Sequence, residues 1–431
     1  MWRGRPRPRT PMTESVPCPP RYNAAVQILI SAGEASGEMY GAQLMESLRK
    51  SLVHPAPVVT GLGPASTQPA QLEFFGAGGE RMRAAGCEII VDAKDLAVVG
   101  ITEILSHLPK ILGLYKKLIR AADEKHPALA IVIDAPAFNW RVARQMRRRG
   151  IPVVYYVCPQ FWAWRQGRVK LLRKYVNRAL VIFPFEEKFY RDRGVEATFV
   201  GHPLANQPAP AVTRESYATQ NQLDPAKQWI TIMPGSRRKE TRMNLPTMLL
   251  AVERLEIESP HAGYEFLLPV ARTLDATFLR DLIATPTKSR PASSLHQKIH
   301  LVPDALPALY HSRAGIVASG TATVEAALMG APFVMVYRVS SLTYALGKPR
   351  VKVPYFAMVN LIAGEEVVQE LVQHRFTAEN IVTEMNKIIP DGAPRTRMIE
   401  RLATVKAKMQ GNSSAANPPE TAARIILKMI G

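Results

Sequence analysis

Short, continuous runs of apolar residues recur along the chain, and most are followed by a turn and a segment with helical spacing. The first unit joins the apolar run 26–31 to a glycine-rich turn and a helix-like segment at 42–52. Strands that are apolar at consecutive positions are covered on both faces, which is typical of parallel sheets flanked by helices. The pattern therefore predicts an α/β fold, with further strands at 128–133, 152–157, 178–183, 197–200, 229–233, 264–270, 298–302, 314–319 and 332–337.

The rhythm of strands and helices is interrupted once, which indicates two domains. Residues 206–222 are rich in proline and small polar residues and predict a linker. We expect two Rossmann-like parallel-sheet domains, at 24–205 and 223–400, that face a common cleft where doubly wound folds bind their ligands. A disordered basic, proline-rich tail is expected at 1–23 and a C-terminal helical segment at 401–431.

The charge of the chain narrows the choice of partners. The 431 residues include 55 Lys and Arg against 36 Asp and Glu, a net charge of +19, while 47% are apolar. This composition excludes a wholly disordered or polytopic membrane protein. The basic excess predicts a polyanionic partner: nucleic acid, an anionic membrane face or phosphorylated substrates. Cys18, Cys87 and Cys158 are too widely spaced for a disulfide framework or a CxxC zinc site, which favours a reducing, cytoplasmic location.

Two strand-to-helix turns in the second half of the chain have the pattern of a phosphate site. In the segment 319–332, a glycine turn leads into an alanine-rich helix, so free backbone N–H groups and the positive helix end can hold a phosphate. The residues concerned are Ser319, Gly320 and Thr321, and Glu325 one turn later can accept hydrogen bonds from ribose hydroxyls. The alternative is that Thr321 is only an N-cap and Glu325 only favours the helix dipole.

The second such turn, at 233–240, carries cations. Gly235 and Ser236 lie in the turn and Arg237 beside it, so the turn can hold a pyrophosphate without a metal ion. An exposed basic turn is the alternative. The sequence has no DxD triplet and no His, Cys and carboxylate cluster with ligand spacing, so we expect neither a metal nor a cofactor.

Two carboxylates follow strands of the first domain. Asp134 ends the strand 128–133, and Glu34 lies in the loop after the first strand. A carboxylate fixed beside a cleft suits a general base. Alternatively, Asp134 caps the next helix and Glu34 only binds backbone N–H groups.

Two segments indicate a surface for an anionic partner. Residues 141–178 contain eleven Lys and Arg, no Asp or Glu, and six interleaved aromatic residues. This mixture fits an RNA surface, an anionic lipid face or a solvated basic face over core aromatics. The segment 100–120 has an apolar stripe with flanking lysines, as in an interfacial helix, although a core-facing helix has the same spacing. Pro109 predicts two short helices there rather than one. The stripe includes Ile101, Ile104, Leu105, Leu108, Ile111 and Leu112.

Nine motifs resemble one family, the lipid-A-disaccharide synthases, which are bacterial glycosyltransferases of the GT-B architecture. The resemblance spans residues 26 to about 375. The stretches PQFWAWR and AGEASG are highly specific, whereas many nucleotide-sugar transferases share the SGT turn. The motifs are AGEASGE (32–38), FGAGGERMRAAGCE (75–88), LAVVGITEIL (96–105), IDAPAFN (133–139), YYVCPQFWAWRQGRVK (155–170), FPFEEKFY (183–190), GHPL (201–204), PGSRRKE (234–240) and SGTATVEAAL (319–328).

The resemblance implies an inverting transfer of 2,3-diacylglucosamine from its UDP carrier to 2,3-diacylglucosamine 1-phosphate, which gives the β-1,6 disaccharide and UDP. It implies that Asp134 is the base and that Glu34 assists it or holds the acceptor. It also implies that Arg237 contacts the diphosphate. Ser319, Gly320, Thr321 and Glu325 are expected around the nucleotide, and Asn360 is expected to contact the donor.

The sequence departs from the family pattern in three places. Ala137 replaces the second Asp of IDAPDFN, Glu38 replaces the Asp of GEASGD, and 358–360 read Met-Val-Asn where the family has LPN.

Acylated substrates imply a peripheral location on the cytoplasmic face of the inner membrane, with the apolar stripe and the basic stretch touching an anionic bilayer. The resemblance also implies a homodimer and no nucleic-acid partner. The competing interpretations are another GT-B UDP-N-acetylglucosamine enzyme, either an epimerase or the peptidoglycan transferase, and a basic nucleic-acid-binding protein.

Overall fold

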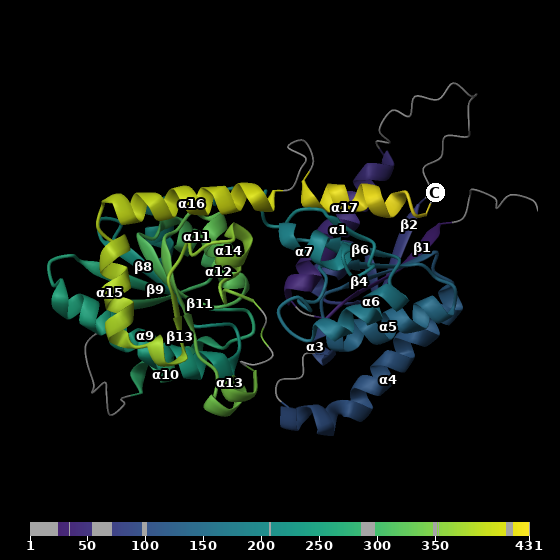
Figure 1. The fold of residues 1–431 in the computed structure, drawn as a ribbon, viewed down its shortest axis with the longest axis horizontal. Coiled ribbons are helices and arrows are strands. Elements are labelled where there is room, and N and C mark those ends of the chain that lie inside the picture. The colour runs from purple at the N-terminus through teal and green to yellow at the C-terminus, as the bar shows by residue number, and fades with distance from the viewer. Residues whose placement is uncertain are drawn as a thin grey trace, which may run out of the picture.

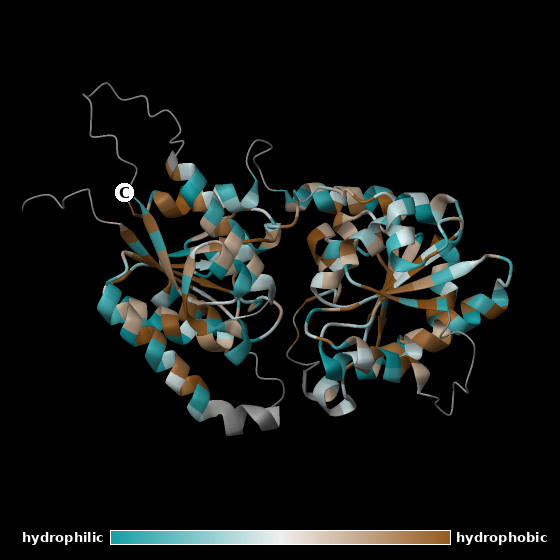
Figure 2. Cartoon of the chain, turned by 180° about the vertical axis from the view of Figure 1, so that it is seen from behind, coloured by the Kyte–Doolittle hydropathy of each residue, from teal (hydrophilic) through white to brown (hydrophobic). Residues whose placement is uncertain are grey.

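The computed structural model describes residues 25–33, 35–53, 71–96, 101–206, 208–285, 298–347, 351, 353–410 and 417–430, with the backbone alone at 35, 53, 101–108, 342, 346 and 347. Two lobes lie side by side, and each is a parallel sheet between layers of helices (Figure 1). Hydrophobic strands fill the middle of both lobes, and hydrophilic residues gather on the outer helices (Figure 2). The predicted fold class is confirmed.

The N-terminal domain contains a seven-stranded parallel sheet in the order β3-β2-β1-β4-β5-β6-β7. Ala32 pairs with Ile133 and Ile133 with Tyr156, so three strands end at the same edge. The strands are β1 (Val26–Ala32), β2 (Leu72–Gly78), β3 (Cys87–Asp92), β4 (Leu129–Ile133), β5 (Val153–Tyr156), β6 (Arg178–Val181) and β7 (Ala197–Phe199). The helices are α1 (Ala35–Val53), α2 (Glu80–Ala84), α3 (Ala93–Leu96), α4 (Ile101–Lys125), α5 (Pro136–Arg148), α6 (Val169–Tyr175) and α7 (Pro184–Arg191).

The C-terminal domain contains a six-stranded parallel sheet in the order β10-β9-β8-β11-β12-β13. Its strands are β8 (Gln228–Met233), β9 (Tyr264–Pro269), β10 (Ile299–Val302), β11 (Ala314–Ala318), β12 (Phe333–Tyr337) and β13 (Glu370–Val372). Its helices are α8 (Arg214–Asn221), α9 (Arg238–Glu258), α10 (Ala276–Ala284), α11 (Ala305–His311), α12 (Thr321–Leu328), α13 (Ser341–Gly347), α14 (Met358–Ala363), α15 (Ala378–Ile388) and α16 (Ala393–Met409).

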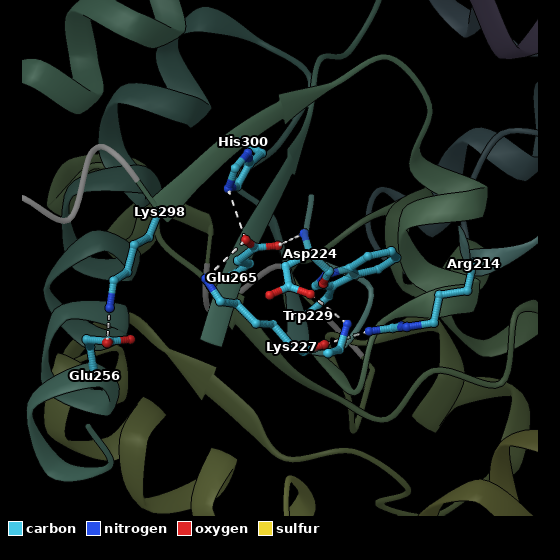
Figure 3. Close-up of polar contacts among 9 residues, drawn as sticks. Arg214, Asp224, Lys227, Trp229, Glu256, Glu265, Lys298 and His300 are labelled. Atoms are coloured by element: carbon cyan, nitrogen blue, oxygen red, sulfur yellow. Dashed lines mark hydrogen bonds and ion pairs between the residues drawn. The ribbon is translucent and has the colours of Figure 1, made fainter. Parts of the chain in front are cut away.

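Helix α8 lies inside the range that was predicted to be a linker, and a polar cluster fixes the residues after it to the C-terminal domain. Figure 3 shows Glu265 between Lys227 and His300. The buried Glu265 carboxylate is 3.5 Å from Lys227 Nζ and accepts a 3.0 Å hydrogen bond from the Asp224 N–H. The Arg214 guanidinium lies 3.7 Å from the centre of the Trp229 ring. The chain from Arg214 onward therefore belongs to the second domain.

The C-terminal helices join the two domains. Helix α16 runs along the C-terminal domain, whereas α17 (Pro418–Leu427) lies over the N-terminal domain and packs against α1 (Figure 1). The loop after β7 meets this crossing: the His202 N–H donates to the Met409 carbonyl at 2.8 Å. A Cβ on Gly201 would lie 2.9 Å from the Pro418 ring. The C-terminal segment thus covers the N-terminal domain of its own chain.

Helix α4 corrects one prediction, because it runs unbroken from Ile101 to Lys125 with Pro109 inside it. A proline costs a helix one hydrogen bond and does not force it to end. The later turns of α4 bury Leu118 in the core, and Ile111 packs partly against it, while Leu112 is 46% exposed. The side chains at 101–108 lie outside the described residues. In the described ranges, no helix is both long and apolar enough to cross a membrane.

Candidate active site between the two sheets

The turn after β4 has an unusual backbone that buried polar groups hold in place. Asp134 and Ala135 have φ angles of 47° and 44°, in the left-handed region. The Asn139 side chain donates to the carbonyls of Asp134 and Ile133, both at 2.9 Å, and the Tyr155 hydroxyl donates to the Asp134 carbonyl at 2.8 Å. Ala135 occupies the N-cap position of α5. Asp134 is therefore held at the carboxyl edge of the sheet and is not the cap of the helix.

The loop after β1 lies against this turn. The Ser31 hydroxyl donates to the Asn139 side chain at 2.7 Å, so one buried amide joins the ends of β1 and β4. A Cβ on Gly33 would lie 2.6 Å from the Cβ of Ala135, which means that only glycine allows the two loops to approach so closely. Glu34, the next residue and the other predicted carboxylate, lies outside the described residues.

Tyr40 is a buried residue whose pKa is affected by two predicted site residues. This side chain of α1 is buried, and its ring contacts that of His202 edge to face, with centres 6.2 Å apart. Burial, together with the negative charges of Glu325 and Asp134, raises the pKa of the Tyr40 hydroxyl well above its usual range. The charge of Glu325 on α12 and that of Asp134 at the end of β4 therefore act on the same side chain.

The turn before α12 is open. Gly320 is the N-cap residue, has a φ of 134°, and receives no side-chain cap; a Cβ built on it meets no atom within 4 Å. Thr321 is exposed. Ser319 has a structural contact instead, because its hydroxyl donates to the Phe356 carbonyl at 3.1 Å. Burial raises the pKa of Glu325, one turn into the helix, to about 7.

The turn before α9 is occupied by a side chain of the protein, that of Glu240. The Glu240 side chain lies in this turn, where burial raises its pKa while the charge of Arg237 acts in the opposite direction. Gly235 has a φ of 117°, and a Cβ on it would lie 2.3 Å from Cδ of Glu240. The Arg237 side chain is exposed. Sequence analysis missed Glu240, although its spacing from Arg237 is that of a capping box, in which an N3 glutamate bonds the N-cap N–H.

Asn360 differs from its predicted role as a donor contact. The residue is fully buried, and its amide donates to the Val368 carbonyl and to Glu370 Oε1, both at 2.9 Å. Its oxygen accepts the N–H groups of Val367 and Val368. Glu370 in turn accepts the Phe356 N–H. Asn360 thus supports the wall behind the α12 turn through Glu370, and all of its hydrogen-bonding capacity is used within the protein.

Two motif residues also have structural partners. The Glu38 carboxylate accepts the Arg81 N–H at 2.6 Å, which satisfies a donor at the start of α2. Trp162, in the middle of PQFWAWR, donates its indole N–H to Glu186 at 2.8 Å. Glu186 also accepts the N–H groups of Ile182 and Phe183, and burial raises its pKa to about 7.

The basic stretch 141–178 proves to be largely a core segment under a charged surface. Four of its aromatic rings are buried, whereas Trp164 is 45% exposed and stacks with Arg165 at 4.1 Å. A platform of stacked rings, which the nucleic-acid interpretation requires, is therefore not presented by these four residues. The buried rings are Tyr155, Tyr156, Phe161 and Trp162.

The fold defines the class. Two parallel-sheet domains joined in this way form the GT-B architecture. A UDP-GlcNAc 2-epimerase from Neisseria meningitidis, solved with UDP-GlcNAc, has a TM-score of 0.58 at 12% identity, covering 94% of this chain and 99% of its own. The calicheamicin glycosyltransferase CalG4 has a TM-score of 0.55 at 14% identity, covering 94% and 98%. At these identities the likeness concerns the fold alone.

The sequence identifies the family. A model of the lipid-A-disaccharide synthetase family matches residues 28–426. The lipid-A-disaccharide synthase of Koribacter versatilis is 50% identical over 405 residues, which cover 94% of this chain and 98% of the relative. That of Acidobacterium capsulatum is 48% identical over 399 residues, covering 91% and 94%. The chain belongs to the lipid-A-disaccharide synthase family and is a glycosyltransferase. This assignment replaces the epimerase and nucleic-acid alternatives.

Proposed function

We propose that the enzyme transfers 2,3-diacylglucosamine from its UDP carrier to 2,3-diacylglucosamine 1-phosphate, with inversion, and releases UDP. The strongest support is the match of residues 28–426 to the lipid-A-disaccharide synthetase family, together with Asp134 at the end of β4 and the open turn before α12. The acceptor's base and the nucleotide's ribose ligand would then belong to one site that both domains form.

In the proposed reaction, the Asp134 carboxylate takes the proton of the acceptor 6-hydroxyl. An electron pair of the deprotonated 6-oxygen attacks the anomeric carbon of the donor from the face opposite UDP. The bond between that carbon and the phosphate oxygen breaks. The carboxylate is aimed by a backbone that Asn139 and Tyr155 hold rigid. Glu34 is proposed to assist the base or to hold the acceptor.

The leaving diphosphate gains negative charge as the bond breaks. In the proposal, the open N–H groups at Gly320 and Thr321 and the positive end of α12 stabilise that charge, together with the Arg237 guanidinium. Glu325 accepts hydrogen bonds from the ribose. Ser319 supports the turn through its bond to Phe356.

We further propose that the enzyme docks on the cytoplasmic face of the inner membrane through α4. Leu112 is exposed on this helix, and exposed Lys116 lies one turn further along the same face. An apolar side chain flanked by cations is the pattern of an interfacial helix, and anionic lipid attracts the cations. Acyl chains of both substrates would then stay in the bilayer. A homodimer is also proposed.

The experiment that tests the reaction incubates the purified enzyme with UDP-2,3-diacylglucosamine and the monosaccharide 1-phosphate. We expect a disaccharide 1-phosphate by mass spectrometry and an equal amount of UDP. Omitting the acceptor controls for simple hydrolysis of the donor. UDP released without disaccharide, or no turnover by the folded protein, would refute the proposal.

A further inference from the structure

We infer that Tyr337 and Phe356 form an aromatic platform that binds the glucosamine ring of the nucleotide-sugar donor. The inference rests on the proposed function, because it takes the turn before α12 as the site of the diphosphate. It adds a pair of residues that holds the sugar ring of the donor, to which the proposed reaction assigns no contact.

The two aromatic side chains of the platform lie against each other at the carboxyl edge of the C-terminal sheet. Tyr337 is the last residue of β12, and Phe356 lies just before α14. Their ring centres are 5.8 Å apart and their planes differ by 29°, which is a stacked arrangement. Both side chains are only partly buried, and both pack on the hydrophobic core. The pair therefore keeps part of its aromatic surface accessible at the strand ends.

Ser319 joins the platform to the turn before α12. Its N–H donates to the Val336 carbonyl at 2.9 Å, one residue before Tyr337. Its hydroxyl donates to the Phe356 carbonyl at 3.1 Å. The next residue in the chain is Gly320, the N-cap residue of α12, which receives no side-chain cap. The platform thus lies beside the N–H groups that are proposed to bind the diphosphate.

A buried carboxylate holds Phe356 from behind. Glu370 on β13 accepts the Phe356 N–H with both oxygens, at 3.0 and 2.9 Å, and the Ala357 N–H at 2.9 Å. The Asn360 amide donates to the same carboxylate at 2.9 Å. Strand β13 also pairs with the end of β12, which carries Tyr337. Both rings are thus placed by fixed backbone, and such preorganisation lowers the cost of ordering the site when a ligand binds.

The order of contacts along this edge matches the order of groups in a nucleotide sugar. Glu325, the proposed ribose ligand, lies one turn into α12, and Gly320 lies at its start. The platform adjoins Ser319, on the other side of Gly320 in the chain. Helices α12 and α14 lie side by side, on the side of their domain that faces the N-terminal domain (Figure 1). A donor that runs from Glu325 past Gly320 therefore brings its sugar to the platform.

The chemistry of the sugar also fits an aromatic surface. The carbon-bound hydrogens of a glucosamine ring form an apolar face with a slight positive charge, which packs on the negative face of an aromatic ring. Uracil stacks on aromatic rings as well. A uracil on this platform, however, would place the ribose away from Glu325. The positions of Glu325 and Gly320 therefore favour the sugar over the base.

The test measures two constants of the transfer reaction: kcat/KM for UDP-2,3-diacylglucosamine and the inhibition constant of UDP. Tyr337→Leu keeps an apolar side chain but removes the ring. We expect its kcat/KM for the donor to fall about two- to tenfold, as for the loss of one aromatic contact, while the inhibition constant of UDP stays unchanged. Tyr337→Phe, which keeps the ring, should lose less. Tyr310→Leu, at an exposed tyrosine of α11, is the control and should change neither constant.

Each other result has a defined meaning. An equal loss for the donor and for UDP in Tyr337→Leu would place the uracil on the platform and overturn the inference, and so would an unchanged kcat/KM. Failure of the wild-type enzyme to form disaccharide would instead overturn the proposed function. If Tyr337→Leu does not fold, a crystal structure of the wild-type enzyme with UDP-N-acetylglucosamine decides. The sugar should lie on the ring of Tyr337 or Phe356, and a sugar that touches neither ring would refute the inference.

Discussion

At the scale of single residues, the backbone around Asp134 determines where its carboxylate points. Two consecutive non-glycine residues with positive φ cost of the order of 1–3 kcal/mol each, and such strain persists only where surrounding contacts hold it. Here the contacts are the buried Asn139 amide and the Tyr155 hydroxyl. Both contacts are made to the Asp134 carbonyl oxygen.

Asp134→Asn is therefore predicted to lower turnover by about 10² or more, because general-base catalysis typically contributes that factor. The affinity for UDP should change little, since the nucleotide turn belongs to the other domain. Steady-state kinetics with both substrates and calorimetry with UDP check this prediction. Turnover close to that of the wild-type enzyme would indicate that Glu34, and not Asp134, is the general base.

Glu325 predicts a pH dependence of stability. Burial raises its pKa from 4.5 to about 7 in the folded protein, so the folded state binds more protons than the unfolded state between these values. The contribution of Glu325 is therefore fully present below pH 4.5 and is lost as the pH rises through 7. Urea unfolding of the unliganded protein should show stability falling from pH 5 to pH 8, and Glu325→Gln should reduce that fall. An equal slope in both proteins would contradict the assignment.

The position of Asp134, Gly320 and Glu325 near the ends of strands could be predicted from sequence, because parallel strands always present their carboxyl ends at one edge. The role of Asn360 could not, since a buried amide and an exposed one look alike in a sequence. Glu240 was missed for the related reason that its side chain lies over Gly235 in a tight turn. Such contacts depend on how the turn closes.

At the scale of elements, a buried hydrogen bond holds the loop that contains the PQFWAWR motif. Trp162 fixes the PQFWAWR loop to the start of α7 through Glu186. Two residues later, Trp164 is 45% exposed. The same loop thus has one tryptophan for anchoring and one at the surface.

Trp162→Phe is predicted to destabilise the protein by roughly 1.5–3 kcal/mol, the usual range for a hydrogen bond to a charged group. Trp164→Phe is the matched control and should change stability by less than about 0.5 kcal/mol, as for most surface substitutions. Urea unfolding measures both. Equal effects of the two substitutions would show that Glu186 does not depend on the indole N–H.

Every strand predicted from a continuous apolar run is present, and the strands that were missed have a common cause. β2 reads LEFFGAG, with glycine in its second half, while β3 (CEIIVD) and β13 (ELV) are short and carry charged residues. Their partners in the sheet determine that they are strands. The helix α8 was similarly hidden within a polar segment, because its burial rests on Tyr217 and Ala218 alone.

At the scale of the whole molecule, α4 has an exposed leucine and a buried leucine on different faces. This pair allows a controlled test of membrane docking. Leu112→Ser should reduce binding to anionic liposomes and leave the melting temperature unchanged, because the side chain is 46% exposed. Leu118→Ser, on the buried face of the same helix, should cost several kcal/mol, about 2–5 for lost burial. Liposome flotation and thermal unfolding separate the two outcomes.

The same helix begins with the predicted contacts Ile104 and Leu108, and Ile104→Ser with Leu108→Ser should weaken flotation further. A sharp fall in melting temperature for Leu112→Ser, with unchanged flotation per folded molecule, would place the stripe in the core and remove the membrane role. The glycosyltransferase assignment would stand in that case.

The chain passes between the two domains twice, once after β7 and once between α16 and α17, and the two passages touch. A single tether would allow one domain to swing and twist freely about the other. Two tethers bound to each other, as at His202 and Met409, are expected to restrict the relative movement of the domains more than a single tether would. Cleavage of the chain in either passage would leave the two domains attached through the other passage but would allow them more relative movement. Catalytic activity should therefore fall before the domains unfold.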